Sequence, residues 1–220
     1  MLGLTFEPLA FAQFSFGVKG GVPILGTIQT QCEFNAELNA LLAPCYSTNT
    51  KRYIVGPTVG FDVSPKWAIE LDALFNRTDY SGSDGIPSPT LPIGIGVISN
   101  RAAVNSWEFP LMVNRRFSLG RTTPFVDAGP SFRHVSVSSQ VTTMMFGTPP
   151  NVTSFTTDHP NELQNRFSVG FSVGTGVEFR ESKLHISPEL RYTRWGFPNI
   201  ERSALTSNPN QLEFVLGVTF

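Results

Sequence analysis

The side chains with the greatest potential for chemistry are charged residues at alternating positions, which share one face of the β-strands that the sequence predicts. Buried charges must be paired, and acids and bases placed together near mid-strand can form such pairs. The favoured interpretation is a structural network that fills the interior of a barrel, and the alternative is a narrow gated path for small ions. The residues predicted for this network are Lys19, Glu70, Asp72, Glu108, Asp127, Arg133, Glu189, Arg191 and Glu213.

A second candidate for chemistry is the pair His134 and Ser136, which alternation places together on the outward face at the end of a strand. A serine nucleophile needs a base that a third group orients, and no Glu occupies a suitable outward position nearby. His159 and His185 are too isolated to form a metal site. We therefore expect no enzymatic activity, no metal and no cofactor.

The two cysteines, Cys32 and Cys45, lie in a segment rich in turn-forming and small polar residues. Their spacing fits neither a redox pair nor a zinc-binding pair. An even number of cysteines closing a short loop indicates one disulfide and an oxidising compartment. The alternative is a pair of free, partly buried thiols.

The composition excludes several classes of protein. The 220 residues include 19 Phe, 19 Gly and 17 Pro, whereas charged residues make up only 15% and the net charge is −1. Soluble domains contain about 25% charged residues, and a chain so rich in Gly and Pro does not sustain long helices. Binding of nucleic acid requires clustered Lys and Arg, and the sequence contains no basic run, so a nucleic-acid-binding function is excluded.

A period of two dominates from Phe14 onward, in stretches of about ten residues, which is the length of a tilted transmembrane strand. Short turns at 64–66, 118–122 and 180–183 alternate with long loops at 23–51, 81–103, 136–165 and 196–210. Sorting of loop lengths between the two rims is typical of an outer-membrane barrel, with turns facing the periplasm. The eight predicted strands are 14–22, 52–63, 67–80, 104–117, 123–135, 166–179, 184–195 and 211–220.

The apolar face of these strands can be oriented in two ways. A lipocalin-like soluble carrier turns it inward around a small ligand, whereas a transmembrane barrel turns it toward lipid. Three features favour the transmembrane barrel. They are aromatic residues near strand ends, glycines on the polar face, and the alternation of short turns with long loops. The residues predicted to face lipid are Trp67, Ile69, Leu71, Phe75, Leu190, Tyr192, Leu212, Phe214, Leu216 and Phe220.

The first twelve residues differ from the rest of the chain. They are apolar and end in Ala10-Phe11-Ala12, the pattern of a signal-peptide cleavage site. We expect residues 1–12 to be the remnant of a signal peptide and residues 13–220 to form the barrel. No apolar run is long enough for a transmembrane helix, so a chain that spans a membrane must do so as a closed barrel.

Several segments resemble the eight-stranded outer membrane protein β-barrel family, the OmpA/OmpX-like group. They are FSFGVKGGV from Phe14, SWEFPL from Ser106, PFVDAG from Pro124, ISPELRYTRW from Ile186 and EFVLGVTF from Glu213. The resemblance implies an all-β, antiparallel up-and-down transmembrane barrel in the outer membrane of a Gram-negative-type bacterium. It also implies that Phe220 belongs to the C-terminal signal that the barrel assembly machinery recognises.

Family membership leaves the function open. We expect a monomer in contact with outer-membrane lipids, with a structural or surface-binding role for an unknown extracellular ligand through its four long loops. The alternatives are the soluble carrier, a narrow ion channel, and a lipid A-modifying enzyme of the kind that uses a His-x-Ser pair with a Glu on the outside of a barrel.

Overall fold

The structure is a computed structural model of the chain. It describes residues 13–30, 32, 45–87, 95–117, 122–146, 151–159, 162–181, 184–202 and 204–220. The predicted signal-peptide remnant, residues 1–12, lies outside these ranges. Within them, no helix is long and apolar enough to cross a membrane.

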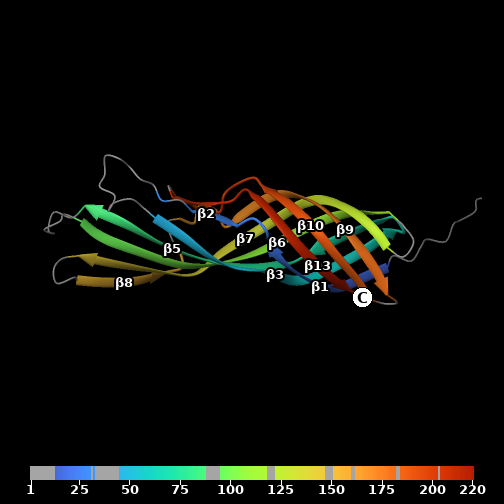
Figure 1. Cartoon of the computed structure of the whole chain (residues 1–220), viewed down its shortest axis with the longest axis horizontal. Coiled ribbons are helices and arrows are strands. Elements are labelled where there is room, and N and C mark those ends of the chain that lie inside the picture. The colour runs from blue at the N-terminus through green and yellow to red at the C-terminus, as the bar shows by residue number, and fades with distance from the viewer. Residues whose placement is uncertain are drawn as a thin grey trace, which may run out of the picture.

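The described strands close into an eight-stranded antiparallel barrel, as the sequence predicted (Figure 1). The first strand, β1, pairs with both β3 and the last strand, β13, so that the sheet has no edge within the barrel wall. One of the eight positions is shared by two consecutive strands, β4 and β5. The barrel strands are β1 (Gln13–Pro23), β3 (Cys45–Ser64), β4 (Trp67–Asp72) with β5 (Leu74–Pro87), β6 (Ile95–Arg116), β7 (Thr122–Phe146), β9 (Phe167–Glu181), β10 (Leu184–Trp195) and β13 (Asn210–Thr219).

The break between β4 and β5 at Ala73 corrects the prediction of one continuous strand. The Ala73 amide donates to the Pro57 carbonyl oxygen at 3.0 Å, so the wall stays closed across the break. A side chain at Gly56 would collide with the carbonyl oxygen of Ala73. Glycine at position 56 therefore permits the close approach of β3 at this irregular point.

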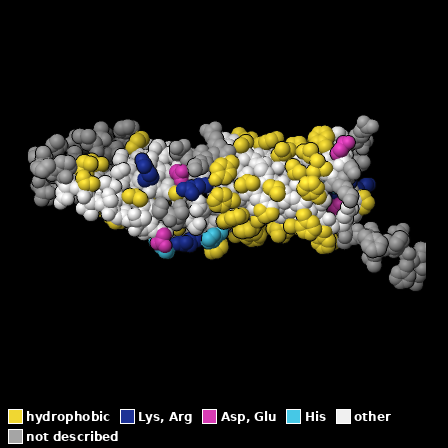
Figure 2. All heavy atoms as spheres, turned by 90° about the horizontal axis from the view of Figure 1, so that it is seen from below, with side chains coloured by type: hydrophobic (Ala, Val, Ile, Leu, Met, Phe, Trp, Pro, Cys, Tyr) yellow, Lys and Arg dark blue, Asp and Glu magenta, His cyan; other side chains and the backbone are white. Residues whose placement is uncertain are grey.

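The two faces of the wall differ as the alternation requires. Odd-numbered residues of β10 such as Arg191 are buried inside, whereas Leu190 is 44% exposed on the outside. Figure 2 shows exposed apolar side chains as a broad band across one half of the visible face of the molecule. Of the ten residues predicted to face lipid, eight are exposed, while Phe75 and Leu212 are half-buried on the same outer surface.

Strands β3, β5, β6 and β7 extend well beyond β10 and β13 at one end of the molecule (Figure 1). At about 3.3 Å per residue and a tilt of about 40°, the 12 residues of β10 rise about 30 Å, whereas the 25 residues of β7 rise about 60 Å. The first distance matches a bilayer, and the second is about twice as long. Parts of the segments predicted as long loops are therefore strands.

The extension beyond the band is a five-stranded sheet, which we call the outer sheet. Its order is β3, β5, β6, β7 and β8 (Asn151–Thr157), with β8 pairing only with β7 among the described strands. Serine and threonine are frequent here and large apolar residues are few, so the period of two was too weak to reveal these strands in the sequence. The outer sheet consists of residues 45–51, 77–87, 95–104, 137–146 and 151–157.

A second, three-stranded sheet lies at the same end of the barrel. It consists of β2 (Ile28–Thr30), β11 (Glu201–Arg202) and β12 (Leu205–Ser207), in the order β11-β12-β2. We call this sheet and the adjoining residues 162–165, 199–202 and 204–208 the cap, because Leu163 and Ile200 form a β-bridge that joins them. The loops at the ends of the first and last strands are therefore folded against each other.

Replacing Leu190 with Arg should destabilise the barrel because this exposed side chain lies within the apolar band. An arginine on the lipid face near the bilayer midplane costs about 2–4 kcal/mol. Val97 is equally exposed, at 44%, but lies in the outer sheet beyond the band. Val97→Arg is thus the matched control and should change stability by less than about 0.5 kcal/mol.

The measurement is reversible urea unfolding of each variant in lipid vesicles, followed by the unheated gel mobility of the folded barrel. Equal losses of stability in the two variants would show that the apolar band is not the membrane-embedded surface.

Candidate functional site

The barrel interior holds a central cluster of five charged residues. The Lys19 ammonium lies 3.2 Å from Asp72 Oδ2 and 3.3 Å from Glu189 Oε2, and it also contacts Glu70. The Arg191 guanidinium lies 2.8 Å from Asp72 and 2.6 Å from Glu189. These residues come from β1, β4 and β10, so the cluster ties together strands that are distant in sequence.

Asp72 is the acceptor at the centre of this cluster. In addition to its two cationic partners, it accepts a hydrogen bond of 2.6 Å from the Thr58 hydroxyl. Its side chain is fully buried. A buried carboxylate is tolerated when its charge is balanced and its oxygens are hydrogen-bonded, and Asp72 meets both conditions.

A loop-end cluster lies further along the interior, toward the cap. The Arg133 guanidinium lies 3.0 Å from Glu108 Oε1 and 3.8 Å above the ring of Trp195. Gln211 donates to Glu108 at 3.0 Å and accepts a hydrogen bond of 2.9 Å from Trp195 Nε1. Glu213 contacts the Gln211 amide nitrogen, and no ion pair to Glu213 occurs within the described residues.

The sequence pattern placed Gln211 and Trp195 on strands but did not identify them as members of a polar site. Gln211 is two residues before Glu213 on the same strand, so both side chains face inward. This spacing was the one feature of the sequence that could have identified Gln211. The three-dimensional pairing of β10 with β13 was needed to join Gln211 to Trp195.

Acidic groups outnumber basic groups in the interior. Of the nine residues predicted for the lumen, six are acidic and three are basic, and the structure places all nine on the inward face. Asp127 is 5% exposed, and neither of its carboxylate oxygens has a hydrogen-bond partner in the described part of the chain. A side chain at Gly174 would collide with Asp127 and meet Glu189, so glycine makes room for these two carboxylates.

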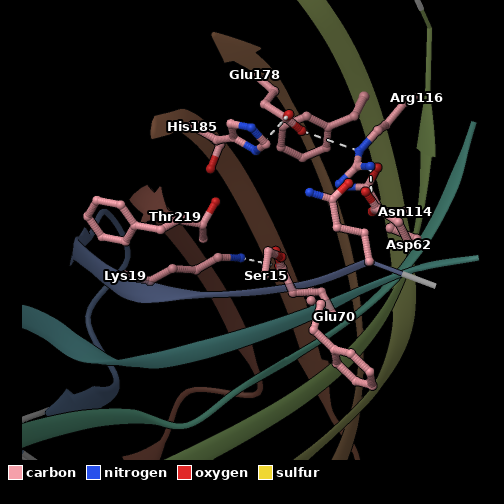
Figure 3. A pocket seen from close by; sticks show the side chains of 16 residues that line it. Ser15, Lys19, Asp62, Glu70, Asn114, Arg116, Glu178, His185 and Thr219 are labelled. Atoms are coloured by element: carbon pink, nitrogen blue, oxygen red, sulfur yellow. Dashed lines mark hydrogen bonds and ion pairs between the residues drawn. The ribbon is translucent and has the colours of Figure 1, made fainter. Parts of the chain in front are cut away.

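The short-turn end of the barrel opens into a cavity of about 350 Å³ (Figure 3). Arg116 forms ion pairs there with Asp62 at 2.6 Å and with Glu178 at 3.3 Å. His185 lies 3.5 Å from the same Glu178. Lys19 and Glu70 are among the residues that line the cavity, so the central cluster forms part of its boundary.

The opposite end of the interior is occupied by the cap. Ile28, Ile200 and Leu205 of the cap pack in one apolar cluster with Tyr80 and Val135 of the barrel wall. The Thr27 and Thr78 hydroxyls form a hydrogen bond of 3.0 Å, and Arg202 contacts Glu162 at 2.7 Å within the cap. Burial raises the pKa of the Tyr80 hydroxyl, which therefore stays neutral beneath the cap.

Cys32 and Cys45 form a disulfide next to this end of the barrel. Cys45 is the first residue of β3, and the two cysteines also form an isolated antiparallel bridge. The covalent bond therefore links the segment after the first barrel strand to the start of the outer sheet.

The candidate pair His134 and Ser136 lies on β7. His134 packs against Phe167 in a tilted arrangement, with ring centroids 4.7 Å apart, on the outside of the barrel. Within the described residues, His134 and Ser136 make no hydrogen bond to each other or to a carboxylate. The contact with Phe167 places His134 among the aromatic side chains of the outer surface.

Aromatic rings flank the apolar band at both ends. Phe75 and Trp107 pack with ring centroids 5.3 Å apart at the loop end, and the Arg115 guanidinium lies 4.6 Å above Trp67 at the short-turn end. The Phe220 amide, at the C-terminus, donates to Phe16 O at 2.8 Å, so the last residue continues the closing pair of strands. Its role as an assembly signal stays a prediction.

Solved structures that are similar to this chain include those of three bacterial proteins. OprG of Pseudomonas aeruginosa is 12% identical, with 94% of each chain covered and a TM-score of 0.47. Neisserial surface protein A is 11% identical, with 96% of this chain and 98% of that chain covered and a TM-score of 0.41. Ail of Yersinia pestis is 11% identical, with 95% and 97% covered and a TM-score of 0.38.

No curated protein sequence matches this chain. The sequence profile of the outer membrane protein beta-barrel domain matches residues 11–201, which is most of the chain. The matched region includes seven of the eight barrel positions and both interior clusters except their residues on β13. The chain, with its closed antiparallel barrel and its apolar outer band, therefore belongs to the outer membrane protein beta-barrel domain family and resides in the outer membrane.

Proposed function

We propose that this protein is a closed-lumen membrane anchor that displays a binding surface beyond the membrane on its outer sheet. The observation that carries the proposal is the extension of β3, β5, β6 and β7 about one bilayer thickness past the apolar band. An anchor alone needs only strands long enough to cross the membrane. The additional, regularly hydrogen-bonded sheet instead provides a rigid platform for recognition.

The outer face of this platform carries a row of exposed apolar side chains. Val97 pairs with Met145, and Met145 pairs with Val152, so the three lie side by side on neighbouring strands. They are 44%, 46% and 52% exposed. Apolar side chains that are contiguous and exposed outside the lipid zone indicate an interaction surface.

The interior supports an anchor better than a channel. The cap packs against the wall at the loop end, and the central cluster bridges the lumen between β1, β4 and β10. Eight strands enclose an interior that side chains can fill. The excess of acidic groups makes a narrow cation path the second candidate, because such a path requires an acidic lining.

Conductance separates these two candidates. A barrel closed by the cap and the central cluster should give no resolved current steps in planar lipid bilayers at neutral pH. Replacing Ile200 and Leu205 of the cap with Ser should leave the bilayer silent, because the central cluster still closes the lumen. Discrete cation-selective steps from the unmodified protein would favour the narrow path.

The central cluster is predicted to contribute to stability through its paired members only. Asp72→Asn removes a carboxylate that two cations and a hydroxyl contact, and breaking a buried ion pair costs about 3–5 kcal/mol. Asp127→Asn is the matched control, since this inward carboxylate has no hydrogen-bond partner among the described residues. It should be neutral or stabilising.

Urea unfolding in vesicles measures both variants. If Asp127→Asn costs as much as Asp72→Asn, the interior does not depend on the described ion pairs, and the closed-lumen account loses its basis.

Adhesion of cells that display the protein on their surface tests the proposed binding surface. Replacing Val97, Met145 and Val152 together with Ser should lower adhesion to immobilised host extracellular-matrix glycoproteins by about tenfold or more, because burial of each side chain contributes about 1–2 kcal/mol. The neighbouring row of Ser99, Thr143 and Ser154 supplies the control, as a triple Ala variant on the same face. Surface expression is matched by antibody labelling.

Unchanged adhesion of the Ser variant, or no adhesion of the unmodified protein above that of cells lacking it, would contradict the proposed binding surface.

A further inference from the structure

A hollow on the outer wall lies just beyond the loop-end aromatic girdle. It has a volume of about 400 Å³ and is formed by β5, β6 and β7. Six of its lining residues occupy outward-facing positions, and the register of β6 against β7 shifts beside Ala103. We call it the arginine hollow, and its outward-facing residues are Arg77, Asp79, Ser81, Arg101, Ala103 and Val141.

We propose that the arginine hollow binds the phosphorylated sugar headgroup of an outer-leaflet glycolipid. Arg77 on β5 and Arg101 on β6 both line the hollow, together with the small side chain of Ala103. Guanidinium groups bind phosphate through paired, charge-assisted hydrogen bonds. The outward charges of the hollow are two cations and one anion, so its balance is positive.

The existing contacts leave the guanidiniums available to a ligand. Among the described residues, Arg77 makes one ion pair, in which its Nε lies 3.4 Å from Asp79 Oδ1. Arg101 is exposed and forms no ion pair within the described ranges of the chain. The Ser81 hydroxyl, opposite Arg101 in the register, shares a hydrogen bond of 3.1 Å with the Ser47 hydroxyl, and its remaining hydrogen-bonding capacity can serve a sugar or phosphate oxygen.

The height of the hollow indicates which lipid it fits. Arg77 is the first outward residue after Phe75 on β5, and Arg101 is the third outward residue after Trp107 on β6. These positions lie about 5 Å and about 15 Å beyond the girdle at the strand rise and tilt used above. A phospholipid headgroup layer is only about 6 Å thick. A larger phosphorylated sugar headgroup is needed to contact both arginines.

The aromatic girdle adjoins the arginine hollow on the side that faces the membrane. Phe75 and Trp107 pack against each other directly below the hollow. Their rings face the zone where acyl chains meet headgroups, which is the usual place of aromatic residues in outer-membrane barrels. The acyl chains of the glycolipid therefore lie along the aromatic pair, while its phosphates reach the arginines. Figure 2 shows Lys and Arg side chains at this border of the apolar band.

The test uses the full chain refolded in a maltoside detergent, which contains no phosphate, and fluorescently labelled lipopolysaccharide as the probe. The double variant Arg77→Gln with Arg101→Gln should bind the probe at least tenfold more weakly than the unmodified protein. Lipopolysaccharide from which the phosphates have been removed should lose as much affinity for the unmodified protein. Asp79→Asn should bind the phosphorylated probe more tightly, because it removes the repulsive carboxylate.

Arg194→Gln is the matched control. Arg194 is also exposed one outward position beyond a girdle aromatic, Tyr192, but it lies on β10 and contacts Asn210 at 2.6 Å. It should change the affinity by less than twofold. Unheated gel mobility shows that each variant is folded, and all replaced side chains are on the exposed surface.

Three outcomes would overturn the proposal. They are equal affinities of the double variant and the unmodified protein, equal binding of the dephosphorylated probe, and equally tight binding of micelles containing phosphatidylglycerol. The last outcome would assign the hollow to any anionic lipid. None of them bears on adhesion through Val97, Met145 and Val152, so failure of this proposal is distinguishable from failure of the proposed binding surface.

Discussion

The rest of the structure depends on one constraint, which is that every backbone polar group in the hydrocarbon layer must find its partner within the protein. The pairing of β1 with both β3 and β13 meets this constraint by leaving no open edge in the membrane. Once the sheet is closed, its pleat divides each strand between lipid and lumen. Leu190 and Arg191 are adjacent in sequence, yet one is exposed to the lipid zone and the other is fully buried.

Charged side chains face the lumen because lipid on the outer face excludes them, and in the lumen they need ion-pair or hydrogen-bond partners. The number of such partners differs between residues. Asp72 has two cations and a hydroxyl, whereas Asp127 has no hydrogen-bond partner among the described residues. The central cluster connects β1, β4 and β10, which are distant from one another in the sequence. It therefore stabilises the closed barrel and also obstructs its interior, with the cap at one end and the cavity at the other.

The parts of the fold that follow from membrane physics could be predicted from the sequence. The alternation in β10 and β13 identified both faces, and the short turns identified one rim. The outer sheet could not be predicted, because segments such as Asn151–Thr157 lie in water on both faces and show no strong apolar period. The contact of Gln211 with Trp195 and the packing of Leu205 under the loop end depend on tertiary structure that local patterns do not contain.

The orientation of the faces is the central claim, and spin-label accessibility tests it most directly. Nitroxide labels would be attached at Leu71, Leu190 and Phe214, one at a time, in a protein whose two native cysteines are replaced, and the barrel would be reconstituted in lipid vesicles. The account predicts high collision rates with oxygen and low rates with a water-soluble nickel complex at all three positions, and the reverse at Val97 in the outer sheet. High accessibility to the nickel complex at positions 71, 190 and 214 would contradict the account.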